Sequence, residues 1–163
     1  MTEQKLTALA QRDFEALQQA HKTLAVAESC TGGWLSKVIT EISGVSAVYL
    51  GGVCTYANSA KERLLGVRPE TLAAHGAVSE QTAREMAEGV RKAFGADVGV
   101  GITGIAGPAS DGTDKPVGLI YVAAANGATT VVRELRNEFR IDVREQNRYS
   151  AVKTALELIG EVL

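Results

Sequence analysis

Short apolar runs alternate with stretches of helical periodicity along most of this chain. Runs rich in β-branched and small residues predict five strands, at residues 24–27, 48–56, 97–103, 118–124 and 129–135. The last two runs are separated by Asn126-Gly127, a dipeptide typical of a tight hairpin turn. We therefore expect the final two strands to be antiparallel neighbours in a mixed sheet.

Helical periodicity, with apolar residues three and four positions apart, separates the first three strands and recurs at both ends of the chain. It predicts helices in residues 1–20, 34–42, 83–94 and 149–163, and a further helix that contains Leu64 and Leu65. Helices on both faces of the sheet give three layers. The predicted fold is a three-layer α/β/α sandwich with a mixed, mainly parallel five-stranded sheet, formed by residues 1–163 as a single domain.

Composition narrows the classes of partner. The chain has 163 residues, of which 45% are hydrophobic and 22% charged, enough to bury a core. The net charge is -2 and the arginines are scattered except for a loose group from Arg133 to Arg148, which argues against nucleic acid as the principal ligand. No stretch resembles a signal peptide or is apolar enough to span a bilayer, so we expect a soluble, cytoplasmic protein without membrane contact. Homo-oligomerisation is left open.

Cys30, Cys54, His21 and His75 are the only cysteines and histidines, and no two of them are spaced as a metal-binding pair. We therefore expect no metal and no cofactor. A disulfide between the cysteines is not expected without a secretory signal. Cys30 could be reactive, but no histidine or second cysteine lies near it in sequence to activate it.

Ser29 lies where the first strand gives way to a helix, in the segment Glu28-Ser29-Cys30-Thr31-Gly32-Gly33. Free backbone amides at a helix N-terminus surround such a serine. It can therefore be an anion ligand, a helix cap or a nucleophile, and the third role needs a partner that takes its proton. Glu28 can orient a ligand or a lysine, or simply stabilise the helix N-terminus.

Lys61 is the candidate partner, because it lies in the first turn of the helix that follows the second strand. Partial positive charge at a helix N-terminus and any burial favour a neutral amine, which can act as a general base. The alternative is a solvated surface lysine. Tyr56, just before this helix, is either a proton relay or a strand aromatic with its hydroxyl at the rim.

Two further segments carry candidate anion ligands. The glycine-rich stretch after the third strand, residues 104–118, can wrap a phosphate or be an ordinary surface loop, and it matches no established phosphate-loop sequence. Arg144 and Arg148 lie on one row of the last helix, where they can reach a ligand anion or lay their stems along the helix surface.

Taken together, five segments resemble the C-terminal domain of the competence/damage-inducible CinA proteins, in order and over nearly the whole chain. They are residues 27–33, Thr55-Tyr56 with Lys61, 75–80, 104–108 and 115–118. The resemblance implies an amidohydrolase that converts nicotinamide mononucleotide to the acid and ammonia without a metal. It also implies the three-layered fold already predicted from the pattern.

The same resemblance implies Ser29 as nucleophile, Lys61 as its base and Tyr56 as a relay or orienting hydroxyl. Amides around Thr31 to Gly33 are then candidate oxyanion donors. The full set of substrate-binding candidates is Glu28, Thr31, Gly32, Gly33, Thr103, Gly104, Ala106, Gly107, Lys115, Arg144 and Arg148.

The chain departs from the family before its last helix, where Gly-Asp-Arg is replaced by Ile141-Asp142-Val143-Arg144. A one-residue shift turns a helical side chain by about 100 degrees, so Arg148 is an alternative ligand for the phosphate. Two other functions therefore stay open. One is the same chemistry on another phosphorylated amide, and the other is a non-catalytic nucleotide-binding or interaction module linked to competence or DNA damage.

Overall fold

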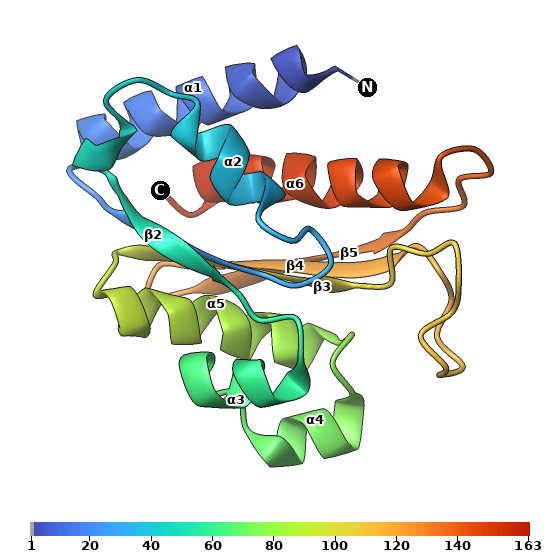
Figure 1. Ribbon diagram of the computed structural model, residues 1–163. Coiled ribbons are helices and arrows are strands. Elements are labelled where there is room, and N and C mark those ends of the chain that lie inside the picture. The colour runs from blue at the N-terminus through green and yellow to red at the C-terminus, as the bar shows by residue number, and fades with distance from the viewer. Residues whose placement is uncertain (1) are drawn as a thin grey trace.

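The computed structural model describes residues 2–163, which form a five-stranded sheet between two layers of helices (Figure 1). The strands are β1 (Leu24–Glu28), β2 (Tyr49–Cys54), β3 (Val98–Gly104), β4 (Leu119–Ala125) and β5 (Thr130–Arg136). Each of the five predicted strands is confirmed. The second is shorter than predicted, because the chain leaves the sheet at Thr55 to enter the next helix.

The order across the sheet is β2-β1-β3-β4-β5. β1 pairs in parallel with both β2 and β3, whereas β4 is antiparallel to β3 and β5. Four strands therefore run in one direction and β4 runs against them, as expected of a mixed, mainly parallel sheet. The hairpin at Asn126 is also confirmed: its side-chain oxygen accepts hydrogen bonds from the amides of Ala128 and Thr129.

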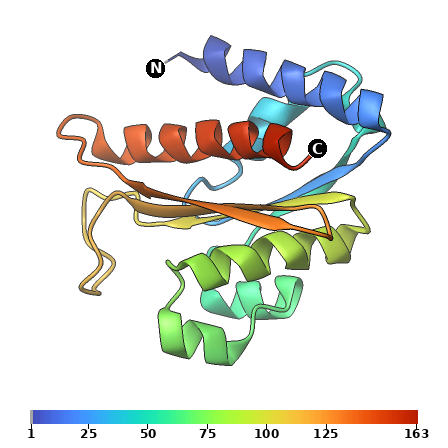
Figure 2. The same ribbon diagram turned by 180° about the vertical axis from the view of Figure 1, so that it is seen from behind.

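Helices lie on both sides of the sheet (Figures 1 and 2). One face carries α1 (Glu3–Ala20), α2 (Trp34–Thr40) and α6 (Val143–Glu161), and the other carries α3 (Asn58–Leu65), α4 (Pro69–His75) and α5 (Glu80–Phe94). A short 3-10 turn (Val45–Ala47) precedes β2. The sequence interpretation omitted α4, although it begins at Pro69 and is followed by Gly76, a pair of residue types that marks helix ends. None of the helices within residues 2–163 is both long and apolar enough to cross a membrane.

The sheet and α5 lie unusually close together, because Gly99 and Gly101 of β3 face that helix. A Cβ atom at Gly99 would lie 2.1 Å from the carbonyl oxygen of Ala87, and one at Gly101 would lie 2.7 Å from that of Ala83. The close backbone approach expected of small residues on one strand face is therefore present.

Side chains of β1 alternate between the two helical layers, and this alternation positions the site. Val26 packs in the core beneath α1, α2 and α6, whereas Ala25 and Ala27 pack in the core that faces α3 and α5. Ser29 continues the second series beyond the end of the strand. Its side chain therefore belongs to the α3 side of the sheet.

Candidate active site

Ser29 and Lys61 are in contact at the carboxyl ends of two parallel strands. Ser29 follows β1, and Lys61 belongs to α3, which begins shortly after β2. The Lys61 Nζ lies 3.1 Å from the Ser29 Oγ, 2.6 Å from the Thr55 carbonyl oxygen and 3.4 Å from that of Tyr56. Because β1 and β2 are parallel neighbours, their ends meet at one edge and bring these two side chains together.

Lys61 is buried, with 1% of its surface exposed, so its reading as a solvated surface lysine is wrong. Within residues 2–163 it forms no ion pair with a carboxylate. Burial therefore lowers the pKa of Lys61 to about 8, and the neighbouring Cys30 opposes only part of this effect. A substantial fraction of the amine is thus neutral near physiological pH.

The surroundings of the Lys61 Nζ suit a neutral amine. A neutral amine has two N–H groups and one lone pair. The carbonyl oxygens of Thr55 and Tyr56 can accept its two N–H groups, which leaves the lone pair for the Ser29 hydroxyl. The geometry is that of a base ready to take a proton from Oγ.

Glu28 caps the helix after the turn. Its fully buried carboxylate accepts hydrogen bonds from the amides of Gly33, Leu35 and Ser36 and from the Ser36 hydroxyl, at 2.9 to 3.1 Å. These donors saturate both carboxylate oxygens at the start of α2. Of the roles considered for Glu28, helix stabilisation is therefore the one its contacts match, and it holds the turn around Ser29 in shape.

Two of the four amides from Cys30 to Gly33 already have partners. The Gly32 amide donates to the Ser29 carbonyl and the Gly33 amide to Glu28. Both glycines have positive φ, 58° and 99°, which a glycine adopts at no steric cost. Among residues 2–163, the Cys30 and Thr31 amides meet no acceptor. These two N–H groups are therefore the ones free to bind a ligand oxygen.

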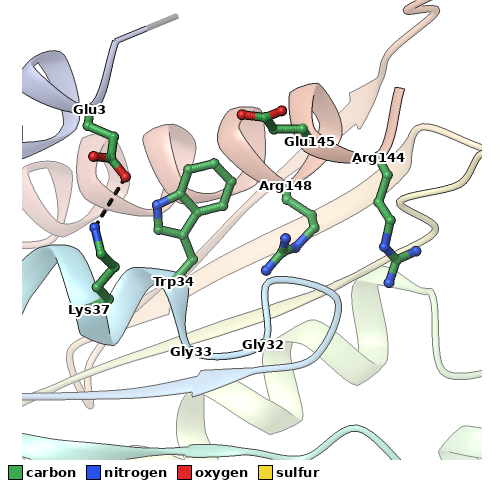
Figure 3. A pocket seen from close by; sticks show the side chains of 8 residues that line it. All are labelled: Glu3, Gly32, Gly33, Trp34, Lys37, Arg144, Glu145 and Arg148. Carbon is green, nitrogen blue, oxygen red and sulfur yellow. Dashed lines mark hydrogen bonds and ion pairs between the residues drawn. The ribbon is translucent and has the colours of Figure 1, made fainter. Parts of the chain in front are cut away.

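Arg148 and Arg144 extend from α6 toward the turn, as Figure 3 shows, while Glu145 points away. Arg148 donates to the carbonyls of Cys30 at 3.1 Å and Thr31 at 2.9 Å. Arg144 donates to the Gly107 carbonyl at 2.8 Å and to the Tyr56 hydroxyl at 3.2 Å. Neither guanidinium has a carboxylate partner within residues 2–163, so each retains positive charge that an anion can neutralise.

Two clefts meet at Arg144. One, of about 440 Å³, is lined by Cys30, Tyr56, Arg144 and residues 104–111, which include the expected Gly104, Ala106 and Gly107. The other, of about 590 Å³, is drawn in Figure 3 and is lined by Glu3, Gly32, Gly33, Trp34, Lys37, Arg144, Glu145 and Arg148. The smaller cleft lies beside the turn of residues 29–33, which holds the candidate nucleophile Ser29 and is called the nucleophile turn below, and it contains Tyr56. We take it as the candidate substrate site.

Neither Thr103 nor Lys115 lines either cleft. The Thr103 hydroxyl donates to the Ala77 carbonyl at 2.7 Å, and the Lys115 ammonium donates to the carbonyls of His75 at 2.6 Å and Val78 at 2.5 Å. Both side chains hold the segment 75–79 between α4 and α5. In this structure Lys115 is therefore engaged with backbone oxygens rather than directed at a ligand in either cleft.

The comparison with known proteins matches the family model described as the CinA C-terminal domain over residues 6–163. This chain belongs to the CinA C-terminal domain family. A CinA-like protein of Desulfovibrio desulfuricans is 52% identical over 145 residues, which cover 89% of this chain and 34% of that protein. A protein of Moorella thermoacetica named as competence-damage inducible is 49% identical, over 90% of this chain and 35% of its own length. The chain thus spans about a third of the length of these relatives.

Solved structures agree with this CinA fold. The competence/damage inducible protein CihA of Agrobacterium tumefaciens superposes with a TM-score of 0.91 at 38% identity, covering 99% of this chain and 96% of that one. A CinA superfamily protein of Escherichia coli gives a TM-score of 0.87 at 32% identity, covering 99% and 91%. The predicted family and fold are therefore confirmed over nearly the whole chain.

The cysteines of this CinA domain are both free thiols. Cys30 is buried, which raises the pKa of its thiol to about 11, so it is protonated at neutral pH and a poor nucleophile. Cys54 is exposed at the end of β2. Of the two neighbours in the turn, Ser29 is therefore the one with an activating partner.

Sequence reasoning missed two contributors to this CinA site. The Thr55 carbonyl is the closest partner of Lys61, and the Trp34 ring lies under Arg148, with the guanidinium carbon 5.4 Å from the ring centroid. A backbone carbonyl carries no sequence signal. Trp34 begins the helix directly after Gly32-Gly33, and this place in the sequence was the one signal that could have indicated its contact with a cation.

Proposed function

We propose that this domain hydrolyses the carboxamide of nicotinamide mononucleotide to nicotinate mononucleotide and ammonia, which returns the acid to pyridine-nucleotide synthesis. The observation that carries the proposal is the contact between the buried Lys61 Nζ and the Ser29 Oγ, next to a cleft that Cys30 and Tyr56 line. A serine paired with a lysine of lowered pKa is a nucleophile with its base in place. Family membership is consistent with an amidohydrolase.

In the first step the Ser29 Oγ attacks the carboxamide carbon while its proton passes to the neutral Lys61 amine. A C–O bond forms, and the carbonyl π electrons move to the oxygen. The resulting oxyanion needs donors, and the amides of Cys30 and Thr31 are those in the turn without another acceptor. The amides of Gly32 and Gly33, which the sequence also suggested, already donate elsewhere.

In the second step the C–N bond breaks and Lys61 returns its proton to the departing nitrogen, which leaves as ammonia. The product is an ester of Ser29. Water then attacks this acyl-enzyme with Lys61 again accepting the proton, and cleavage of the ester releases the acid and restores the Ser29 hydroxyl. The cycle consumes one amide and one water and requires no further reactant.

Arg144 is the residue best suited to hold the phosphate of the substrate. It is exposed, forms no ion pair with a carboxylate of residues 2–163, and lies on the wall of the candidate substrate cleft. The volume of that cleft, about 440 Å³, is within the range of small-ligand sites. Although Arg144 is shifted by one position relative to the family pattern, its contact with Tyr56 brings it over this cleft.

The direct test is to incubate the protein with nicotinamide mononucleotide and follow ammonia and the acid product, with Ser29→Ala and Lys61→Ala in parallel. Turnover by the wild type, reduced by about 10³-fold or more in both variants, supports the proposal. If Ser29→Ala retains activity, the nucleophile assignment is wrong. If the folded wild type does not turn over this substrate but hydrolyses another phosphorylated amide, only the substrate is wrong. Binding without any turnover identifies a non-catalytic module.

A further inference from the structure

We propose that Arg148 is a positioning residue, which holds the nucleophile turn so that the Thr31 amide serves as an oxyanion donor, and is not a ligand for the substrate phosphate. This inference rests on the proposed serine hydrolase chemistry. It assigns to Arg148 a role different from the one that its charge and place on α6 suggest.

The guanidinium of Arg148 is already committed to the turn. Its Nε donates to the Cys30 carbonyl and its Nη2 to the Thr31 carbonyl, so one planar group bridges two successive peptide oxygens. The Trp34 ring supports the same guanidinium. Arg148 is half-buried, whereas Arg144 is exposed. Arg148 also lines only the larger cleft, and Arg144 lines both.

Fixing the Cys30 carbonyl also fixes the direction of the next amide. In a trans peptide the C=O and N–H groups point to opposite sides, so the Thr31 N–H points away from Arg148. Arg148 belongs to α6, on the sheet face that includes Val26, and the Ser29 side chain lies on the opposite face with Lys61. The Thr31 N–H is therefore directed toward the side on which an oxyanion would form next to the Ser29 Oγ.

The rest of the turn leaves this amide free. The Thr31 carbonyl also accepts a hydrogen bond from the Trp34 amide, and the Gly32 amide donates one to the Ser29 carbonyl. These bonds, together with those of Arg148, satisfy the three carbonyls from Ser29 to Thr31. Without Arg148, the Cys30 carbonyl would lose its bond to the guanidinium, and the Cys30–Thr31 peptide would be free to rotate out of alignment.

The kinetic test compares Arg148→Met with Arg144→Met on nicotinamide mononucleotide and on the riboside that lacks the phosphate. Removing one oxyanion donor typically lowers kcat by about 10² to 10³-fold. We expect Arg148→Met to lower kcat by about 10²-fold on both substrates with little change in KM. Arg144→Met should instead raise KM for the nucleotide alone. A rise in KM that is confined to the nucleotide in Arg148→Met would show a phosphate ligand and overturn the proposal.

Two further variants separate positioning from general loss of structure. Arg148→Lys keeps the charge but cannot bridge two carbonyls, so it should remain well below the wild type in kcat. Guanidinium added to Arg148→Ala should restore part of kcat, which a structural defect would not permit. Full activity in Arg148→Lys, or no effect of guanidinium on correctly folded Arg148→Ala, would contradict the proposed bridge.

A fluorophosphonate probe makes the test independent of the amide substrate. Its reaction with Ser29 depends on the nucleophile and the oxyanion donors, and mass spectrometry measures the labelling rate. Arg148→Met should label about 10²-fold more slowly than the wild type, with exposed Arg136→Met on β5 as the unaffected control. If wild type neither labels nor turns over substrate, the proposed function itself fails. Labelling of Arg148→Met at the wild-type rate would contradict the positioning role of Arg148 and leave the proposed function intact.

Discussion

The guanidinium of Arg144 donates a hydrogen bond to the Tyr56 hydroxyl at 3.2 Å, joining the start of α6 to the segment that follows β2. Tyr56 is 64% exposed and its ring stands at the rim of the smaller cleft. Lys61, by contrast, contacts the Ser29 Oγ directly. The tyrosine is thus better placed to orient Arg144 than to handle the serine proton.

We therefore expect Tyr56→Phe to raise KM for nicotinamide mononucleotide more than it lowers kcat. Loss of the hydroxyl removes a partner of Arg144, while the contact between Lys61 and Ser29 is untouched. The expected fall in kcat is less than about tenfold, because general base catalysis by Lys61 is retained. Steady-state kinetics on the variant measure both constants. A fall in kcat of several hundredfold would contradict the orienting role and show that Tyr56 acts as a proton relay.

The activity should rise with pH through about 8. Lys61 must be neutral to accept the serine proton, and burial lowers its pKa from 10.5 to about 8. Below that value each unit of pH costs about a factor of ten in the neutral fraction, and above it the rate levels off. The measurement is kcat/KM between pH 6 and 10 in matched buffers. A profile that is flat between pH 6 and 9 would contradict a lysine base.

Lys61→Arg is the matched variant for this profile. Arginine retains a donor near the serine but stays protonated throughout the accessible pH range. We expect it to be inactive at every pH, without the rise seen in the wild type. Recovery of its activity at pH 9 would show that the titrating group of the wild type is another residue.

Stability should fall as pH rises from about 4 to 7 because of Asp13, which lies in α1. This carboxyl is 2% exposed, and burial raises its pKa from 3.8 to about 7 although Arg12 partly offsets the effect. In this window the folded state binds more protons than the unfolded state, so the free energy of unfolding decreases with pH. A shift of this size corresponds to roughly 4 kcal/mol across the window.

Asp13→Asn should remove this dependence and raise the melting temperature at pH 8 by several degrees. The amide keeps an oxygen that can accept from Arg12, as the Asp13 Oδ1 does at 2.7 Å, and it carries no charge to bury. Thermal unfolding at pH 5 and pH 8 measures the difference. Glu15→Gln, an exposed change on the same helix, is the control, and an equal gain in both variants would show that burial of Asp13 is not the cause.

Gly99→Ala should destabilise the domain by about 2 kcal/mol or more, because the new Cβ would lie 2.1 Å from the Ala87 carbonyl and force α5 away from the sheet. Gly160→Ala is the opposite control. A Cβ at this position in α6 would make only ordinary van der Waals contact, with the Arg12 Nη2 nearest at 3.5 Å, so alanine should stabilise the helix by up to about 1 kcal/mol. Chemical denaturation of both variants measures the changes. Equal effects at the two positions would argue against the close approach of α5.

The sequence by itself determined the strands, most helices and the hairpin at Asn126, because each depends on a repeat or a turn within a few residues. It also located Ser29 at the end of the first strand and Lys61 in the helix that follows the second strand. The sequence pattern did not predict α4, because only one of its seven residues, Thr71, is buried and the helix therefore has little apolar periodicity.

Only the tertiary structure decided what each polar side chain does. The sequence does not show whether Lys61 is solvated or buried; in the fold its Nζ is enclosed beside the Ser29 Oγ and the Thr55 carbonyl, and this burial lowers its pKa. Arg144 and Arg148 are alike in sequence, yet one lies over a cleft and the other holds the nucleophile turn. These roles arise from contacts between residues distant in the chain, where burial and the supply of hydrogen-bond partners are set by packing rather than by local pattern.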